Sequence, residues 1–248
     1  MQTHIVFAHP EAKSFNGALA DIACEVLAAQ GVKITRSNLY ADGFDPVEGP
    51  CHYTQPDDPG YFSALTEQRH AGNNSTRPTA VQREIEHLEA ADLVILQFPL
   101  WWHAQPAILK GWFDRVFVYG DLYTGSKRYD EGYFRGKRAV LSVTTGGPEA
   151  TFSPYGRGGP IERLLWPIHY SLHYMGFDVL APFVAHGIQG GGIAYQQRDA
   201  FDQHLADQKR RWTDRLVALE AARPIPFTGW NDWDGGVLCA DHPQRWLL

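Results

Sequence analysis

The chain of 248 residues is 44% hydrophobic and 20% charged, which is ordinary for a globular protein of one large domain. Its net charge of −6 argues against nucleic acid as a partner, because phosphate binding requires a basic face. The apolar runs are far shorter than the roughly 20 residues of a membrane span, and the N-terminus resembles a strand more than a signal peptide, so we expect a cytoplasmic protein that is not integral to a membrane.

Strands and helices are predicted to alternate along the chain. In chain order, the apolar patterns give strand 4–8, helix 16–31, strand 32–40, helix 78–91, strand 93–98, helix 107–120, strand 139–145, a helix near 161–175, strand 178–184 and a helix near 199–222. Five strands alternating with helices predict an α/β fold, a doubly wound parallel five-stranded sheet in three α/β/α layers.

Two segments fall outside this pattern. Residues 41–76 are rich in Gly, Pro, Asp and Asn and lack clear periodicity, and so long a segment is usually functional or lies against a partner. Residues 223–248 are aromatic and rich in Pro and Gly. We therefore expect a main domain over 1–222 and a C-terminal extension over 223–248 that packs on this domain or on a partner subunit.

Three strand exits carry unusual side chains, at 8–16, 98–106 and 144–159. Ligands of open parallel sheets bind at the carboxyl ends of the strands, where the strand order reverses. If the strand order is flavodoxin-like, the three exits converge at one edge of the sheet.

The first exit offers His9, Lys13, Ser14 and Asn16 just before a helix. Helix N-terminal N–H groups and small hydroxyls bind phosphate, and a lysine or a protonated histidine adds positive charge. The alternative interpretation is an ordinary helix cap by Ser14 or Asn16.

The second and third exits suggest a flat ligand. Trp101 and Trp102 follow a strand and precede Pro106, which fits an aromatic ligand, a dimer interface or a hydrophobic lid over a helix end. Gly146 and Gly147 leave backbone N–H groups unobstructed, although a tight turn with positive φ would also need glycine.

Other motifs predict less. His169 and His173 have the i, i+4 spacing of a zinc pair, but the carboxylate of an HExxH motif is absent, so we expect no metal site. Gly190 to Gly192 predict a mobile loop, with a phosphate cradle as the alternative. The three cysteines form no CxxC pair and are expected to be free in a reducing compartment.

Several stretches together resemble a known family. They are "AHPEAKSFNGAL", "LEAADLVILQFPLWWHAQPAILKGWFDRVF", "AVLSVTTGG" and "LLWPIHYSLHYMGFDVLAP", which cover most of residues 4–182. The order of "FPLWW", "PAILKGWFDRVF" and "TTGG" is similar to that of the NAD(P)H:quinone oxidoreductases of the flavodoxin-like superfamily, of the FAD-dependent DT-diaphorase type.

This resemblance implies a cofactor site on the three exits. The positions that match the surroundings of the flavin pyrophosphate are His9, Lys13, Ser14, Phe15, Asn16 and Ala18. Those along the ribityl chain and ring edge are Pro99, Leu100, Trp101, Trp102 and His103. Those at the pyrimidine end of the ring are Thr144, Thr145, Gly146 and Gly147, and Arg198 is a looser match near the adenine.

The resemblance also implies an activity. Hydride would pass from NAD(P)H through FAD to a quinone-like acceptor in a two-electron, ping-pong reaction, within a homodimer. The long segment 41–76 favours FAD over FMN, because shorter FMN-type relatives lack much of it. The alternatives on the same fold are an azo- or nitro-reductase, and a regulatory flavoprotein ancillary to a potassium-efflux system.

Departures from the family pattern fall after the third exit. Phe152 and Gly158 stand where a tyrosine and a histidine help to compensate charge on the reduced flavin, and neither can donate a side-chain hydrogen bond. Tyr155 and Arg157 are our candidates for this catalytic role, with ordinary surface residues as the alternative. His103 replaces a usual aromatic residue, so we expect a different substrate shape.

Overall fold

A computed structural model describes residues 1–188 and 197–239, so Gly190 to Gly192 lie outside the described residues. The elements in chain order are β1 (Gln2–Phe7), α1 (Phe15–Ala29), β2 (Lys33–Asn38), η1 (Pro50–His52), α2 (Ala64–Asn73), α3 (Thr79–Ala90), β3 (Leu93–Pro99), α4 (Ala107–Val116), η2 (Tyr129–Glu131), β4 (Arg138–Thr144), η3 (Glu149–Phe152), α5 (Ile161–Tyr174), β5 (Asp178–Val179), β6 (Phe183–Ala185), α6 (Arg198–Val217), η4 (Trp230–Asp232), β7 (Trp233–Asp234) and β8 (Val237–Leu238). Within these ranges, no helix combines the length and the apolarity that crossing a membrane requires.

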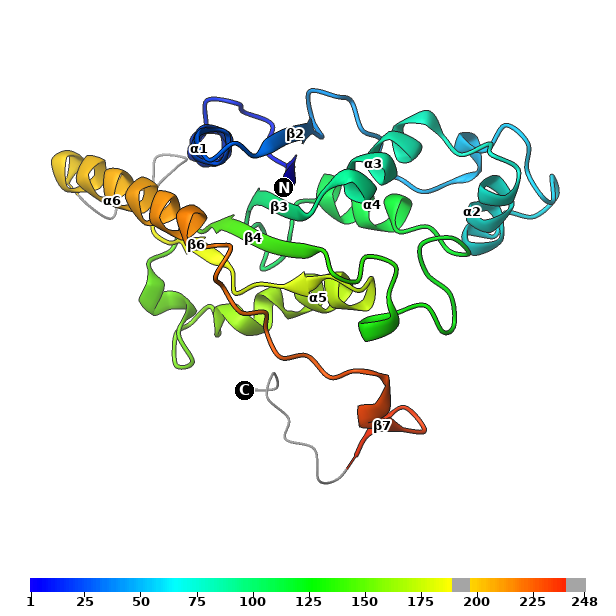
Figure 1. The fold of residues 1–248 in the computed structure, drawn as a ribbon. Coiled ribbons are helices and arrows are strands. Elements are labelled where there is room, and N and C mark those ends of the chain that lie inside the picture. The colour runs from blue at the N-terminus through cyan, green and yellow to red at the C-terminus, as the bar shows by residue number, and fades with distance from the viewer. Residues whose placement is uncertain (189–196, 240–248) are drawn as a thin grey trace.

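The central sheet is parallel and has the strand order β2-β1-β3-β4-β5, with β6 also pairing with β4 (Figure 1). β5 and β6 therefore share the fifth position of the sheet. This order confirms the predicted flavodoxin-like fold. The order reverses between β1 and β3, so the carboxyl ends of β1, β3 and β4 lie next to one another.

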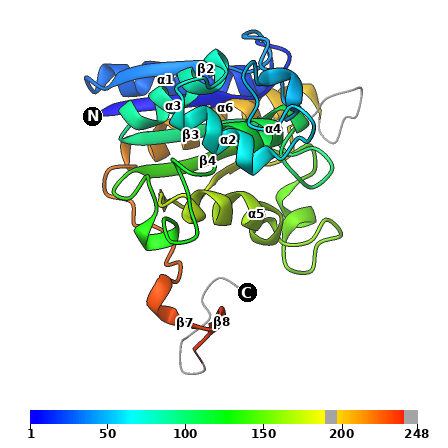
Figure 2. The ribbon, with the colours of Figure 1, turned by 90° about the vertical axis from the view of Figure 1, so that its right-hand side faces the viewer.

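Helices cover both faces of the sheet, as the alternating pattern predicted (Figures 1 and 2). One apolar cluster packs α3, α4 and α5 against the sheet and includes the fully buried Trp112. A second cluster packs α1 and α6 against the opposite face and includes the fully buried Trp212. β3 lies between both layers, and all of its residues are buried, which explains its continuous apolar run.

The structure differs from the predicted elements in two places. α2 lies inside the segment 41–76, where no helix was predicted. The pattern did not indicate it because the buried residues of α2 are mainly Glu67 and Gln68, which give no apolar stripe. The predicted strand 178–184 is split into β5 and β6, and Pro182, which has no N–H to donate, lies in the gap between them.

The described part of the C-terminal segment, 223–239, contacts the main body. Pro224 forms an antiparallel bridge with Leu180, and the Ile225 N–H donates to the Val179 carbonyl at 2.7 Å. Further along, the ring of Phe227 stacks on His173 with a centroid separation of 4.5 Å.

Candidate functional site

A cavity of about 510 Å³ opens at the carboxyl ends of β1, β3 and β4. These are the strand ends at which the sequence predicted that the three unusual segments converge. The lining residues of the cavity are His9, Ser14, Phe15, Asn16, Pro99, Leu100, Trp101, Thr144, Thr145, Gly146 and Ile188. All of these except Ile188 were predicted to bind a cofactor. The fold therefore brings segments as distant in sequence as those of His9 and Ile188 into one site. Its volume is in the range of small-molecule pockets, about 300–1,000 Å³.

The remaining predicted residues do not line this cavity. Lys13 and His103 are exposed, Ala18 is half-buried in α1, and Gly147 follows the lining residue Gly146. Arg198 lies at the exposed start of α6, where it pairs with Asp202. Trp102 is 96% exposed, and its role as a flavin contact stays a prediction.

The first wall is the N-terminus of α1. Ser14 is its N-cap and accepts a hydrogen bond from the Gly17 N–H at 3.1 Å, so the capping interpretation holds for this serine. A Cβ on Gly17 would lie 1.9 Å from the Ala12 carbonyl oxygen, which shows how tightly the loop wraps this helix end. The remaining N–H groups of the first turn have no intrahelical acceptor and suit an anion.

His9 stands beside this wall as a neutral side chain. Burial lowers its pKa from 6.5, and its contacts with the Glu11 backbone oppose this only in part. His9 Nδ1 lies 3.0 Å from the Glu11 backbone nitrogen and 3.1 Å from the Glu11 carbonyl oxygen, so either tautomer of the neutral ring has a hydrogen-bond partner at this nitrogen. At pH 7 the neutral His9 ring therefore does not add the positive charge that the sequence suggested for a phosphate site.

The floor of the cavity is a buried polar chain. The Asn16 side-chain amide donates to Thr144 Oγ1 at 2.8 Å, and Gln97 Nε2 donates to Asn16 Oδ1 at 2.8 Å. Gln97 Oε1 has no hydrogen-bond partner among the described residues. Gln97 was not predicted as a site residue, although a single polar side chain within the apolar run 93–98 was a visible signal.

Residues 101–104 form a tight turn along the second wall. The N–H of Trp101 donates to the Ala104 carbonyl at 3.0 Å, and the N–H of Ala104 returns to the Trp101 carbonyl at 3.1 Å. The two central residues, Trp102 and His103, have φ of +52° and +63°. This is the pattern of a type I′ turn, which normally contains Asn-Gly. The left-handed region costs roughly 1–2 kcal/mol for each such residue, so strain is stored at this wall.

The turn aims its two tryptophans in different directions. Trp101 is 42% exposed, lines the cavity and lies with its ring 5.9 Å from that of His9. Trp102, at the tip of the turn, points away into solvent in the single chain. The sequence left the direction of Trp101 open, and the structure places it on the cavity side.

The third wall is held by a network behind Thr145. Its hydroxyl donates to the Gly147 carbonyl at 2.9 Å and lies 3.0 Å from His186 Nδ1. His186 was not predicted, because it follows a separate strand and carries no motif. A Cβ on Gly146 would meet no atom closer than the Ile188 carbonyl oxygen, at 3.8 Å, and φ is not positive at Gly146 or Gly147. The interpretation of these glycines as a positive-φ turn is therefore wrong.

The predicted catalytic candidates lie outside this cavity. Tyr155 is fully exposed and Arg157 is exposed, both in the turns after η3. Phe152 instead stacks on His186 at 5.5 Å, and a Cβ on Gly158 would lie 3.2 Å from the Phe152 ring. The two departures from the family pattern thus pack against each other, and the role of Tyr155 and Arg157 stays a prediction.

A parallel sheet of order β2-β1-β3-β4-β5 with a cavity at the strand-order reversal is the arrangement of flavodoxin-like proteins. The sequence pattern of the flavodoxin-like fold family matches residues 1–214, and the chain belongs to this family.

Two mammalian relatives extend this result. A ribosyldihydronicotinamide dehydrogenase (quinone) of Mus musculus is 42% identical over 226 residues, which cover 90% of this chain and 94% of the relative. An NAD(P)H dehydrogenase (quinone) 1 of Cavia porcellus is 44% identical over 225 residues, which cover 90% of this chain and 78% of the relative. The chain is therefore similar to quinone dehydrogenases over most of its length.

A bacterial crystal structure gives the same result for the fold. It is a proposed quinone reductase from Klebsiella pneumoniae, with a TM-score of 0.85 and 35% sequence identity. The match covers 97% of this chain and 92% of that structure, so the likeness extends over nearly the whole chain.

Proposed function

We propose that this protein is an NAD(P)H:quinone oxidoreductase that binds FAD in the cavity at the carboxyl ends of β1, β3 and β4. The observation that carries the proposal is the convergence of the three chemically unusual strand exits on this one cavity. The similarity to quinone dehydrogenases over 90% of the chain supports the same activity.

The residues present fit a flavin. The N-terminus of α1 offers unpaired N–H groups for an anionic phosphate, and Phe15 and Trp101 offer apolar faces for a flat ring. The open space at Gly146 lets backbone approach a ligand without interference from a side chain. A site for phosphate at one wall and for a flat ring at the others is what a flavin nucleotide needs.

Each wall then has a task in the proposed reaction. A bound flavin supplies the two-electron chemistry between a dihydronicotinamide and a quinone, and the chain supplies binding and orientation. The chain of Gln97, Asn16 and Thr144 fixes the floor, and the network behind Thr145 fixes the turn at 145–147. Trp101 and Leu100 exclude water from one side of the cavity.

The choice of FAD over FMN rests on the segment 41–76 and on the likeness to the longer relatives. Relatives named for ribosyldihydronicotinamide and for NAD(P)H match at 42% and 44% identity, so the identity alone does not choose the hydride donor. We propose NAD(P)H, and assays with NADH, NADPH and dihydronicotinamide riboside side by side decide between the donors.

We also propose a cytoplasmic homodimer in which 1–222 is the flavin-binding domain and 223–248 the extension. A second cavity of about 590 Å³ supports the dimer, because α4 and α5 line it with aromatic residues such as Phe113, Phe117 and Tyr170. Its rim includes Leu65, which is 50% exposed. The three cysteines are free, which fits a reducing compartment. Light scattering that compares the molar mass of the wild type with that of Leu65→Asp tests the dimer. A wild type with the mass of a single chain contradicts it.

The decisive experiment identifies the cofactor and then measures turnover. The purified protein is expected to be yellow, to release FAD on denaturation, to lose its colour with NAD(P)H and to regain it with benzoquinone. A colourless protein that does not take up added FAD contradicts the proposal. Weak turnover with every simple quinone, together with stable flavin binding, would favour the regulatory flavoprotein instead.

A further inference from the structure

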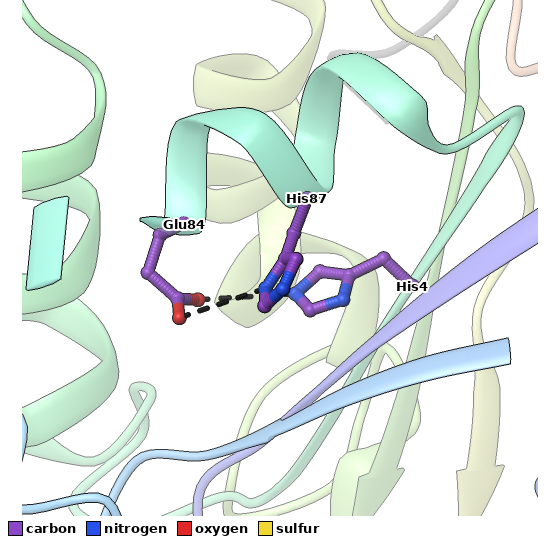
Figure 3. Close-up of side chains that lie close together, drawn as sticks. All are labelled: His4, Glu84 and His87. Carbon is purple, nitrogen blue, oxygen red and sulfur yellow. Dashed lines mark ion pairs between the residues drawn. The ribbon is translucent and has the colours of Figure 1, made fainter. Parts of the chain in front are cut away.

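A largely buried cluster of two histidines and a glutamate lies between α3 and β1 (Figure 3). His4 lies on β1, and Glu84 and His87 lie one turn apart on α3, with the three side chains directed toward one another. His4 Nε2 is 3.8 Å from one Glu84 oxygen, and His87 Nδ1 is 3.9 Å from the other. The side chains of His4 and Glu84 are fully buried, whereas that of His87 is 29% exposed.

Neighbouring hydrogen bonds fix the orientation of the buried pair. Trp112 Nε1 donates to one Glu84 oxygen at 2.9 Å, and the Ser37 hydroxyl donates to the other at 2.8 Å. A carboxylate has about four lone-pair positions, so about two remain for another ligand. His4 Nδ1 lies 2.9 Å from Thr35 Oγ1, and donation to this hydroxyl leaves the Nε2 lone pair facing Glu84.

Among the described residues, Glu84 forms ion pairs with the two histidines of the cluster and with one arginine. The nearest guanidinium, that of Arg83, lies 3.4 Å away and is 45% exposed. An ionised carboxylate in the core needs close charge compensation, which a half-exposed arginine supplies only in part.

We propose that His4, Glu84 and His87 bind a zinc ion that fastens α3 to β1. Two imidazole nitrogens and one carboxylate oxygen form a set that zinc prefers, with water in the fourth position. Tetrahedral zinc bonds of about 2.0–2.1 Å put the ligand atoms about 3.3 Å apart. The two ion-pair separations given above exceed this value by about half an ångström, and all three ligand atoms lie within 4.8 Å of one another.

The site has an entry route and is separate from the proposed reaction. The half-buried His87 gives an ion access from solvent, and the inner side chains complete the shell. β1 carries His4 in its early half, whereas the cavity begins beyond its carboxyl end, at His9. The zinc proposal therefore does not depend on the proposed function.

The test uses untagged, full-length protein with its flavin, treated with a chelator, dialysed and then given zinc chloride alone. The wild type is expected to retain one zinc per chain after a second dialysis and to show a higher melting temperature with zinc than without. His87→Gln, at the half-exposed position, is expected to fold but to lose the zinc and the shift in melting temperature. Glu84→Gln is a second variant, which keeps an acceptor for Trp112 or Ser37.

Two control variants locate the ion. His70 has the same 29% exposure as His87 and faces Asp57 at 3.1 Å without a second histidine, so His70→Gln should retain zinc. His173→Gln should retain it as well, because His173 Nε2 already bonds the Thr228 carbonyl at 2.9 Å. If the wild type binds no more zinc than His87→Gln, or if His87→Gln keeps the ion, the cluster is an ion-pair network only and the proposal is wrong.

Discussion

The strained turn at 101–104 leads to a quantitative prediction. Replacing Trp102 and His103 by Asn and Gly gives the pair that a type I′ turn favours. The two left-handed residues cost roughly 1–2 kcal/mol each, and the greater freedom of glycine in the unfolded chain removes about 0.5–1 kcal/mol of the gain. Trp102 is 96% exposed, so little burial is lost. We expect the free energy of unfolding to rise by about 1–3 kcal/mol.

The assay is urea unfolding of the flavin-free protein, with thermal unfolding as a second measurement. A gain of 1 kcal/mol corresponds to a rise of about 2–4 °C in melting temperature for a domain of this size. The control is Val47→Gly, at a residue that is 68% exposed and has no positive φ. It should lower the stability by about 0.5–1 kcal/mol. A double variant that is less stable than the wild type would refute the strain argument.

Three further predictions concern single side chains. Burial lowers the pKa of His169 to about 4, so between pH 6.5 and pH 4 the unfolded chain binds a proton that the folded chain does not. The free energy of unfolding therefore falls by roughly 3 kcal/mol as the pH drops through this window. His169→Leu should flatten this pH dependence, measured by urea unfolding at pH 7 and at pH 4. Gln97→Leu removes the donor to Asn16 and should raise the flavin dissociation constant about fivefold, measured by fluorescence, whereas an unchanged constant shows that the floor does not orient the cofactor. Arg157→Ala and Tyr155→Phe should slow hydride transfer in stopped-flow assays by about 10-fold if either compensates charge on the reduced flavin, and unchanged rates in both contradict that role.

The strands and the three exits could be predicted because they depend on local patterns. An apolar run such as 93–98 has to be buried on both faces, and the fold then brings its carboxyl end beside the others. α2 escaped because its inward residues are polar: Gln68 donates to the Asp114 carbonyl and accepts from the Tyr119 N–H. A helix whose buried face is polar shows no apolar periodicity in its sequence, so it could not be predicted in this way.

The parts of the site that could not be predicted depend on contacts across the fold. Trp102 and His103 are not the residues of a usual type I′ turn, so their sequence gives no sign of it. His186 reaches Thr145 from 41 residues away. His4 looks like an isolated polar residue within a strand, and only the packing of α3 brings Glu84 and His87 to it.

The bridge between Pro224 and Leu180 has a consequence for how the molecule avoids self-association. Edge strands present unpaired N–H and C=O groups that recruit other chains into sheets. The segment that begins at Pro224 pairs with the outer edge of the sheet beside β5. Pro224 and Pro226 have no N–H to donate to a further strand. The opposite edge, β2, carries Lys33 and Arg36. Truncation after residue 222 would therefore uncover one edge of the sheet and convert a protected surface into a template for aggregation.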